Sequence, residues 1–404
     1  MSAIDEVAAE DVLGLYLSPG EPFWQAATTV PTPALIYDFD ALAHTARVMQ
    51  ADIGVIPGAR LNLALKACHT PAVLAWIASL GLGCDVASVG ELRLAQKVGF
   101  AEISATGPAF SVEDFRAFRD AGVVPDADSI SQLETYAQHF PGCEVGLRLR
   151  LPLAPHLESN ATFGAESRFG IVPADKRLVR AIVASGLRVT RLHVHTGQML
   201  PEAAVYKLEY LLAVAEVFPE VNRIDLGGGL FHFYANPARA RTALASLRDV
   251  LGGFNRSHGR SIDLRFEPGG ALMAPCGYLI AEVRALEEHP HLGGRIVTVD
   301  ASAWNLAPWH KPQVFVLPDR EGELRPGRIA GNTLYENDFF ARDVLGRQEE
   351  LRFGECRVGD RLVITAAGAY TLTNGRRFNR IPMPSEFAIR GEELVLLAHV
   401  DGTP

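Results

Sequence analysis

Between residues 40 and 268, short apolar runs alternate with longer segments that have the periodicity of an amphipathic helix. The helical segments, such as 40–53, 71–81, 88–99, 111–122 and 201–218, carry apolar residues at i, i+3 and i+4. Eight strand-like runs lie in this region: LNLALK, LGCDV, AEISAT, AGVVP, CEVGLRLR, LRVTRLHVH, VNRIDLGGG and IDLRFEPG. Such strict alternation of strands and helices predicts a parallel sheet.

The number of these units restricts the fold further. Eight strand–helix units within roughly 230 residues are typical of a (β/α)8 barrel of the TIM type, which needs about 250. The alternative is an open, doubly wound sheet. In a barrel, the carboxyl ends of all strands meet at one mouth, where active sites are built.

The pattern changes near Cys276, where short β-like runs follow one another between Pro and Gly residues. These runs are YLIAEVRAL, GRIVTVDAS, QVFVL, RIAGN, DRLVITAAGAY and ELVLLAHV. They predict an antiparallel β domain, and the strand-like run PTPALIYDF before the first helix is expected to join it. The expected domains are therefore a barrel over 40–275 and a β-rich domain formed by 1–39 and 276–404.

Charge and cysteine usage exclude several classes of protein. The net charge of −9 over 404 residues does not favour nucleic acid or an anionic membrane as a partner, since both need a basic face. No apolar stretch has the length of a membrane span, and the first 20 residues contain acids but no lysine or arginine, unlike a signal peptide. Five scattered cysteines without a CxxC pair indicate free thiols in the cytoplasm and no zinc site.

Five ionisable residues and one glycine run stand at or near the ends of the strand-like runs. In chain order these are Lys66, Asp85, Arg148, His195, Gly227–Gly229 and Glu267. Each has an ordinary explanation: a strand-end lysine usually reaches water, a histidine is usually a satisfied polar residue, and a glycine run is usually a turn. A barrel, however, would bring all of them to one mouth.

One cofactor suits this combination of groups. A glycine turn after a strand offers backbone N–H groups to a phosphate, and a lysine of lowered pKa can form an imine with an aldehyde. A carboxylate can keep a pyridine nitrogen protonated, and a histidine can lie against the ring face. Together these features predict pyridoxal 5′-phosphate (PLP). Because DLGGGLF does not match GxGxxG, a nicotinamide cofactor is less favoured.

These segments resemble, in order and over nearly the whole chain, the fold-type III PLP-dependent decarboxylases. That family includes ornithine, diaminopimelate, arginine and carboxynorspermidine decarboxylases, with alanine racemase as a distant relative. The segments ALKAC, GCDVASVGEL, GLRLR, HVHTGQ, DLGGG, EPGG and GAYT carry the resemblance. It implies that Lys66 is the Schiff-base lysine, that His195 stacks on the ring and that Glu267 protonates the pyridine. The implied cofactor-binding set is Lys66, Asp85, Arg148, His195, Gly227, Gly228, Gly229, Glu267, Gly269, Gly270 and Tyr370.

The chain departs from the family pattern at three places. Gly270 replaces the arginine of EPGR, and Gln198 replaces a serine. The family's cysteine–acid pair, which the resemblance places across a dimer interface, is missing from GNTLYENDFF. The nearest proton donor is Tyr335, which we expect to complete the catalytic set of Lys66, His195 and Glu267. Substrate contacts are expected from Tyr335, Glu336 and Asp338.

The sequence thus predicts a cytoplasmic, homodimeric PLP-dependent decarboxylase of a diamino or otherwise polar-tailed amino acid, in polyamine or siderophore biosynthesis or another amino-acid pathway. No metal is expected. One alternative is a racemase, which Glu267 opposes because alanine racemase pairs the ring nitrogen with an arginine. The other is a non-catalytic binding protein, which the missing cysteine favours and the retained Lys66, His195 and Glu267 oppose.

Overall fold

The computed structural model describes residues 16–158, 163–292, 294–307, 309, 311–320, 322–342 and 347–398. The described chain forms two compact units. The first comprises Ala46–Lys66 and Ile77–Ala271, and the second comprises Tyr16–Thr45, Ala67–Trp76 and the residues from Leu272 onward. Most of the N-terminal stretch used in the signal-peptide argument, 1–15, and the end of the last predicted strand, 399–400, lie outside the described residues.

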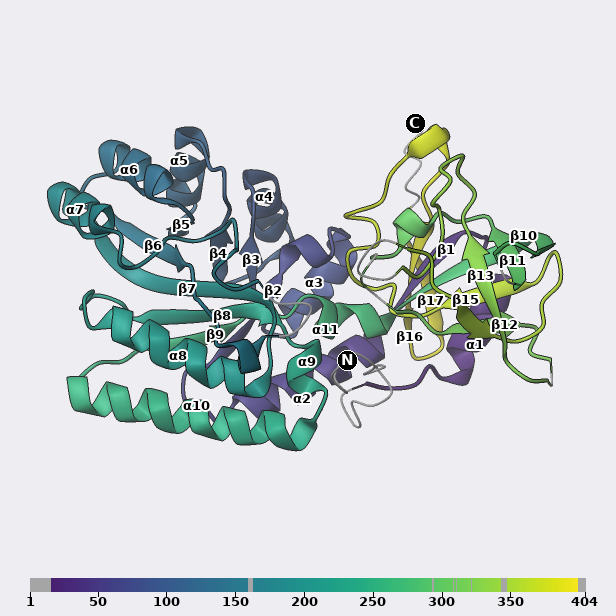
Figure 1. Cartoon of the computed structure of the whole chain (residues 1–404), viewed down its shortest axis with the longest axis horizontal. Coiled ribbons are helices and arrows are strands. Elements are labelled where there is room, and N and C mark those ends of the chain that lie inside the picture. Colours follow the sequence, from purple (N-terminus) through teal and green to yellow (C-terminus); the bar gives the residue numbers. More distant parts are fainter. Residues whose placement is uncertain are drawn as a thin grey trace. The chain divides into compact units, whose positions relative to one another are not determined.

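The first unit contains a closed barrel of eight strands, each parallel to its neighbours (Figure 1). The strands are β2 (Arg60–Ala64), β3 (Gly83–Val86), β4 (Ile103–Thr106), β5 (Pro125–Ala127), β6 (Glu144–Leu149), β7 (Arg188–Gln198), β8 (Arg223–Gly229) and β9 (Asp263–Phe266). The barrel prediction is therefore confirmed, and the open sheet was wrong. One strand was misplaced: the run AGVVP shares only Pro125 with β5.

Helices connect the strands, and several of them, such as α5, α6, α7, α8 and α10, lie on the outside of the barrel (Figure 1). They are α2 (Phe39–Ile53), α3 (Pro71–Ser79), α4 (Val89–Val98), α5 (Val112–Asp120), α6 (Ile130–His139), α7 (Lys176–Ser185), α8 (Pro201–Ala215), α9 (Phe231–Tyr234), α10 (Pro237–His258) and α11 (Gly270–Met273). Serines at 88, 111 and 129 accept hydrogen bonds from the backbone N–H three residues on, which fixes where α4, α5 and α6 begin.

The second unit contains a nine-stranded sheet with the main order β14-β13-β11-β10-β1-β16-β17. Its strands are β1 (Ala34–Asp38), β10 (Gly277–His289), β11 (Gly294–Val299), β12 (Val314–Leu317), β13 (Arg325–Ala330), β14 (Leu351–Phe353), β15 (Arg361–Ile364), β16 (Ser385–Arg390) and β17 (Glu393–Ala398). β15 pairs with β10 and β12. As predicted, the N-terminal run joins this sheet as β1. The sheet is mostly antiparallel, but β1 pairs with β16, and β11 with β13, in parallel.

A continuous apolar core lies beneath the centre of this sheet. Helix α1 (Glu21–Thr29) contributes Phe23, whose ring lies 4.4 Å from that of Tyr278 on β10. Ile36, Ile280 and Phe387 from three adjacent strands belong to the same buried cluster. Four of the five residues of β1 are buried, as is typical of a strand at the centre of a sheet.

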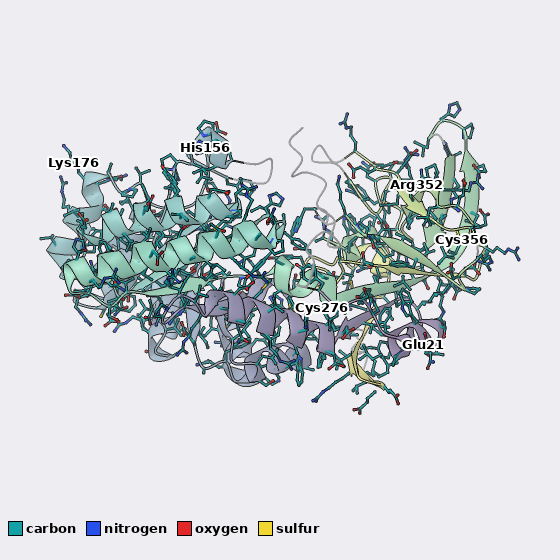
Figure 2. All side chains as sticks on the ribbon, turned by 90° about the horizontal axis from the view of Figure 1, so that it is seen from below. Glu21, His156, Lys176, Cys276, Arg352 and Cys356 are labelled. Atoms are coloured by element: carbon teal, nitrogen blue, oxygen red, sulfur yellow. The ribbon has the colours of Figure 1, made fainter. Side chains whose placement is uncertain are left out.

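All five cysteines are free thiols, as expected from their scatter along the chain. Cys276 and Cys356 are labelled at separate places in Figure 2. Within the described residues, no helix combines the length and apolar character that crossing a membrane requires.

Candidate active site

Strand β7 carries three ionisable residues on one face. Arg191, His193 and His195 stand at every second position, and alternate residues of a strand point to the same side. Arg191 is 3% exposed and His193 2%, whereas His195, nearer the carboxyl end, is half-buried. The barrel therefore buries charged groups in a layer below its mouth.

Arg191 lies among four carboxylates that come from four different strands or strand ends. Its Nη2 is 2.9 Å from Asp225 Oδ2 and 3.3 Å from Glu267 Oε1. The same nitrogen is 3.5 Å from Asp85 Oδ1 and from Asp126 Oδ2. All five side chains are at most 5% exposed. One guanidinium thus faces four acids, so the cluster contains more acidic groups than cations.

The proton affinities of the cluster are set first by burial and then by the neighbouring charges. Burial raises the pKa of Glu267 well above its ordinary value; Asp225 and Asp85 raise it further, while Arg191 and Lys66 oppose the shift. Burial also raises the pKa of Asp126, against the opposing effect of Arg191. For Arg191 itself, burial would lower the pKa, but the carboxylates, Asp126 and Asp225 first, raise it.

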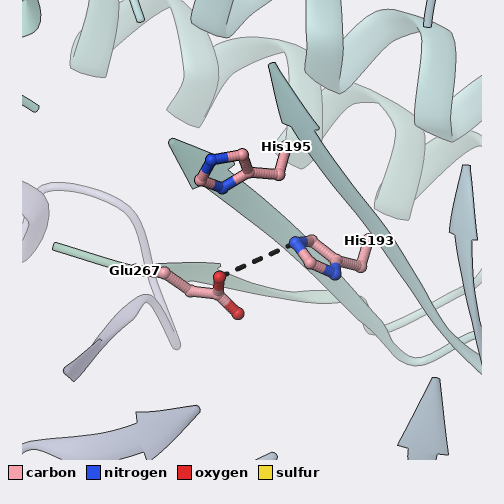
Figure 3. A group of neighbouring side chains, drawn as sticks. All are labelled: His193, His195 and Glu267. Atoms are coloured by element: carbon pink, nitrogen blue, oxygen red, sulfur yellow. Dashed lines mark ion pairs between the residues drawn. The ribbon is translucent and has the colours of Figure 1, made fainter. Parts of the chain in front are cut away.

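His193 joins the same layer and points toward Glu267 (Figure 3). Its Nε2 is 3.6 Å from Glu267 Oε2, and its Nδ1 is 3.1 Å from Asp126 Oδ2. Burial lowers the pKa of His193 to about 3, so the imidazole is neutral near pH 7. Burial, and then the charge of Lys66, lowers the pKa of His195 well below its ordinary value.

His193, His195 and Glu267 also have the composition of a metal site, with ligand atoms within 4.8 Å of one another. Arg191 opposes a cation here, because its Nη2 is only 3.3 Å from Glu267 Oε1. The expectation of no metal stays a prediction.

The glycine run forms the carboxyl end of strand β8, where the predicted run VNRIDLGGG also ends. There is no room for side chains: a Cβ on Gly227 would lie 2.6 Å from His193 Nε2 and 2.9 Å from Val194 O. A Cβ on Gly228, which has a φ of +139°, would lie 2.8 Å from Gly197 O. Only glycine allows this close approach of β8 to β7.

Lys66 lies immediately beyond β2, in a 3₁₀ turn (Leu65–Ala67), and its side chain is exposed in the single chain. The predicted run LNLALK is therefore longer than the strand it contains, because β2 ends at Ala64. The positive charge of Lys66 nevertheless lowers the pKa of His195 and opposes the rise in the pKa of Glu267. Gly269 is buried after β9, and Gly270 begins α11.

Arg148 on β6 has partners inside the barrel unit. Its Nη1 donates to Asp128 Oδ1 at 3.1 Å, and its guanidinium lies 4.4 Å from the centre of the Phe169 ring. These contacts give it a structural role, whereas its predicted cofactor contact stays a prediction.

The remaining predicted residues belong to the second unit. Tyr335 stacks on Trp304 with ring centres 5.1 Å apart and is 39% exposed; Glu336 is exposed. Both carboxylate oxygens of buried Asp338 accept hydrogen bonds, from Ser302 and Ala303 and from Thr333, which favours a role in holding this loop. Tyr370 adopts a φ of +58°, and its N–H donates to Ala67 O.

Sequence reasoning missed Arg191, His193, Asp126 and Asp225, and also a buried lysine, Lys207. The first two could have been found, because LRVTRLHVH places an ionisable residue at every second position of an otherwise apolar strand. Asp126 was missed because its strand was misplaced. Asp225 was missed because only the glycines of the run VNRIDLGGG were considered as binding residues.

Comparisons with known proteins agree with this geometry. Residues 42–274 match the family model described as "Pyridoxal-dependent decarboxylase, pyridoxal binding domain". Because this match spans more than half of the chain, the chain belongs to the pyridoxal-dependent decarboxylase family. It is a PLP-dependent amino-acid decarboxylase, which confirms the predicted enzyme class and cofactor.

Curated relatives cover most of the chain. A diaminopimelate decarboxylase of Zymomonas mobilis is 26% identical, over 93% of this chain and 92% of its own. One from Methanothermobacter thermautotrophicus is 28% identical, over 85% and 83%. Among solved structures, a diaminopimelate decarboxylase has a TM-score of 0.80 at 21% identity and covers 93% of both chains. A Vibrio vulnificus lysine/ornithine decarboxylase complexed with cadaverine has a TM-score of 0.73 at 20% identity, covering 91% and 98%. These structures share the fold.

The residues present fit PLP on two observations of this structure. The buried cluster around Arg191 has more carboxylates than cations, which suits a protonated ring nitrogen. Near the glycine run, buried Thr196 Oγ1 and Gln198 Oε1 have no hydrogen-bond partner in the described part of the chain. A ligand group bound at this edge would provide partners for these two atoms.

Proposed function

We propose that this enzyme removes the α-carboxyl group of a diamino acid, using a barrel-mouth site built from Lys66, His195 and Glu267. The observation that carries the proposal is the acid-rich layer around Arg191, with Glu267 at its upper end. Bound PLP supplies an electron sink that stabilises negative charge at the substrate Cα. The protein therefore has to hold the ring nitrogen protonated, exclude water and deliver a proton to Cα.

Each residue has a distinct part in this proposal. Lys66 would hold the cofactor covalently through Nζ, and His195 would lie against its ring. Glu267 would keep a proton on the ring nitrogen, a role that suits a carboxyl group whose pKa burial raises. Arg191 would hold Glu267 in place through its 3.3 Å contact. Gly227–Gly229, Gly269, Gly270 and Tyr370 would enclose the phosphate, with Asp85 and Arg148 as the further predicted cofactor contacts.

The substrate tail is proposed to occupy a pocket of about 380 Å³ in the second unit. Trp304 and Trp309 line it together with Arg342 and Arg376, and none of its described lining residues is acidic. Two arginines favour a carboxylate on the tail, since their guanidinium groups pair with carboxylates. A diamino acid with a second carboxyl group would fit both the proposed reaction and the arginines of the pocket. Relatives of this chain are named diaminopimelate decarboxylases, after a substrate of this kind.

We also propose that the enzyme is a homodimer in which the second unit, corresponding to the predicted 1–39 and 276–404 domain, completes a partner's barrel site. A group of exposed apolar and aromatic side chains supports this. Leu334 is 89% exposed, Trp309 59%, Phe378 43% and Tyr335 39%. Clustered apolar exposure of this kind is typical of an interface. Tyr335, Glu336 and Asp338 would then be near the substrate. The free thiols support a reducing compartment, which we propose is the cytoplasm.

The test measures carbon dioxide release from a panel containing meso-diaminopimelate, the L- and D-forms of lysine and ornithine, and polyamine precursors. We expect the highest kcat/KM for a dicarboxylic diamino acid, and no release with Lys66→Ala. Borohydride should attach PLP to the wild-type chain but not to that variant, as read by mass spectrometry. Turnover of lysine above that of every dicarboxylate would reject the substrate proposal. Full activity of Lys66→Ala would reject the site.

A further inference from the structure

Lys207 occupies a core position on α8 that an apolar residue would normally take. Its side chain is 0% exposed, and the helix buries Ala204, Leu208 and Leu211 on the same side. Lysine is almost never fully buried without a partner, because taking an ammonium group out of water is costly. The position therefore needs an explanation.

The contacts within the unit do not supply a counter-charge. Nζ donates one hydrogen bond, to Gly227 O at 3.2 Å, although an ammonium group has three donors. No carboxylate of the described residues lies within 4.0 Å of Nζ. Burial lowers the pKa of Lys207 to about 7, without a neighbouring acid to oppose the shift. A structural ion pair, the usual reason for a buried lysine, is thus absent in the described part of the unit.

The surroundings of Nζ have the character of an anion site. A Cβ on Gly228 would lie 3.4 Å from Nζ, so the ammonium borders the glycine run directly. On the neighbouring strand, the 2% exposed Thr196 has an unpartnered hydroxyl, and the Gln198 side chain lies against Gly229. A buried ammonium group beside a side-chain-free turn, with an unpartnered hydroxyl on the neighbouring strand, is a setting that suits a phosphate dianion. Neither glycine segment at this edge, Gly227–Gly229 or Gly269–Gly270, carries a charge of its own.

We propose that Lys207 is the cation that binds the phosphate group of PLP from behind the Gly227–Gly229 run. The ammonium would stay charged once the dianion is bound, which removes the cost of burying it. This inference rests on the proposed function, because that proposal assigns the phosphate to the glycine run. It adds a cofactor-binding residue that lies on a helix outside the barrel and not at the end of a strand.

The experiment compares PLP with pyridoxal, which lacks the phosphate, as ligands of the apoprotein. Dissociation constants are measured by absorbance for the wild type, Lys207→Met and Lys207→Gln. The glutamine variant removes the charge but keeps a donor for Gly227 O, which protects the fold. We expect both variants to weaken PLP about ten- to hundredfold and to leave pyridoxal unchanged. The exposed Lys97→Met should bind both ligands as the wild type does.

The outcomes separate this inference from the proposed function. A wild-type apoprotein that binds neither ligand would overturn the proposed function and, with it, the role of Lys207. Normal wild-type binding, with a preference for PLP over pyridoxal that Lys207→Gln leaves intact, would overturn only the inference. Equal weakening of both ligands would mean that Lys207 supports the fold and not the phosphate.

Discussion

At the scale of single residues, the site depends on groups whose protonation is set by burial. His193 is the clearest case, because the folded barrel shields it from water and holds its pKa near 3. An unfolded histidine titrates near 6.5. Lys207 is shifted in the same direction by the same cause, from its ordinary value down to about 7. Both groups therefore link the stability of the barrel to pH.

The sign of the effect at His193 follows from its lowered pKa. Between pH 6.5 and about 3, the unfolded chain binds a proton at this residue and the folded chain does not, so stability falls as the pH falls. We expect the free energy of unfolding of the wild type to drop more steeply than that of His193→Gln, by up to about 1.4 kcal/mol per pH unit. Urea unfolding at pH 6.5 and 4.5 measures this. The exposed His139→Gln should follow the wild type, and parallel wild-type and His193→Gln curves would refute the prediction.

Tyr335 is the proposed substitute for the family's proton-donating cysteine. A phenol, with an ordinary pKa of about 10, can still protonate a carbanion-like Cα, and general acid catalysis is typically worth 10²–10⁴-fold. Tyr335→Phe keeps the ring that stacks on Trp304 but removes the hydroxyl. We expect it to slow amine formation more than carbon dioxide release, so that the molar ratio of amine to carbon dioxide falls below one. An unchanged ratio and rate would show that Tyr335 only packs against its neighbours. The proton donor would then be Lys66 or Glu336.

At the scale of elements, strand β7 organises the site. Its alternation sends Arg191, His193 and His195 inward, while Arg188 at its start lies at the surface beside Glu144. The same strand thus carries one buried and one exposed arginine, with side chains 3% and 48% exposed. This contrast allows the buried cluster to be tested within one element.

Replacing Arg191 by methionine should leave four carboxylates without their cation. Removing one partner of a buried ion pair typically costs about 3–5 kcal/mol, so Arg191→Met should lower the free energy of unfolding by that amount. Arg188→Met, which breaks a surface pair, should cost at most about 1 kcal/mol. Urea unfolding at pH 7 measures both variants. A loss for Arg191→Met no larger than that for Arg188→Met would contradict the central role of Arg191.

At the scale of the whole molecule, the proposed catalytic groups are divided between two compact units. Lys66, His195 and Glu267 belong to the barrel unit, and Tyr335 belongs to the unit with the nine-stranded sheet. The exposed aromatic residues around Tyr335 support contact with a second copy of the chain. A shared site of this kind makes activity depend on association.

Hybrid dimers provide the test of this arrangement. Lys66→Ala and Tyr335→Ala should each be inactive or nearly so, but a mixture should regain activity because some hybrid dimers contain one site with both intact residues. At random association of equal amounts, half of the dimers are hybrids and each carries one intact site, so roughly a quarter of the wild-type activity is expected. A fully active monomer, detected by sedimentation, would refute the proposal. A mixture that stays inactive under conditions in which the subunits exchange would also refute it.

The sequence by itself determined the barrel, the joining of the N-terminal strand to the β domain, the enzyme class and the cofactor. These features depend on local periodicity and on short motifs that read the same in any context. Only the tertiary structure decided that Arg191 faces acids from β3, β5, β8 and the end of β9, because such contacts join residues up to 106 positions apart. It alone showed that Lys66 is exposed beyond β2 and that Lys207 borders the glycine run. Burial and neighbouring charges, which set proton affinity, arise only when distant segments pack together.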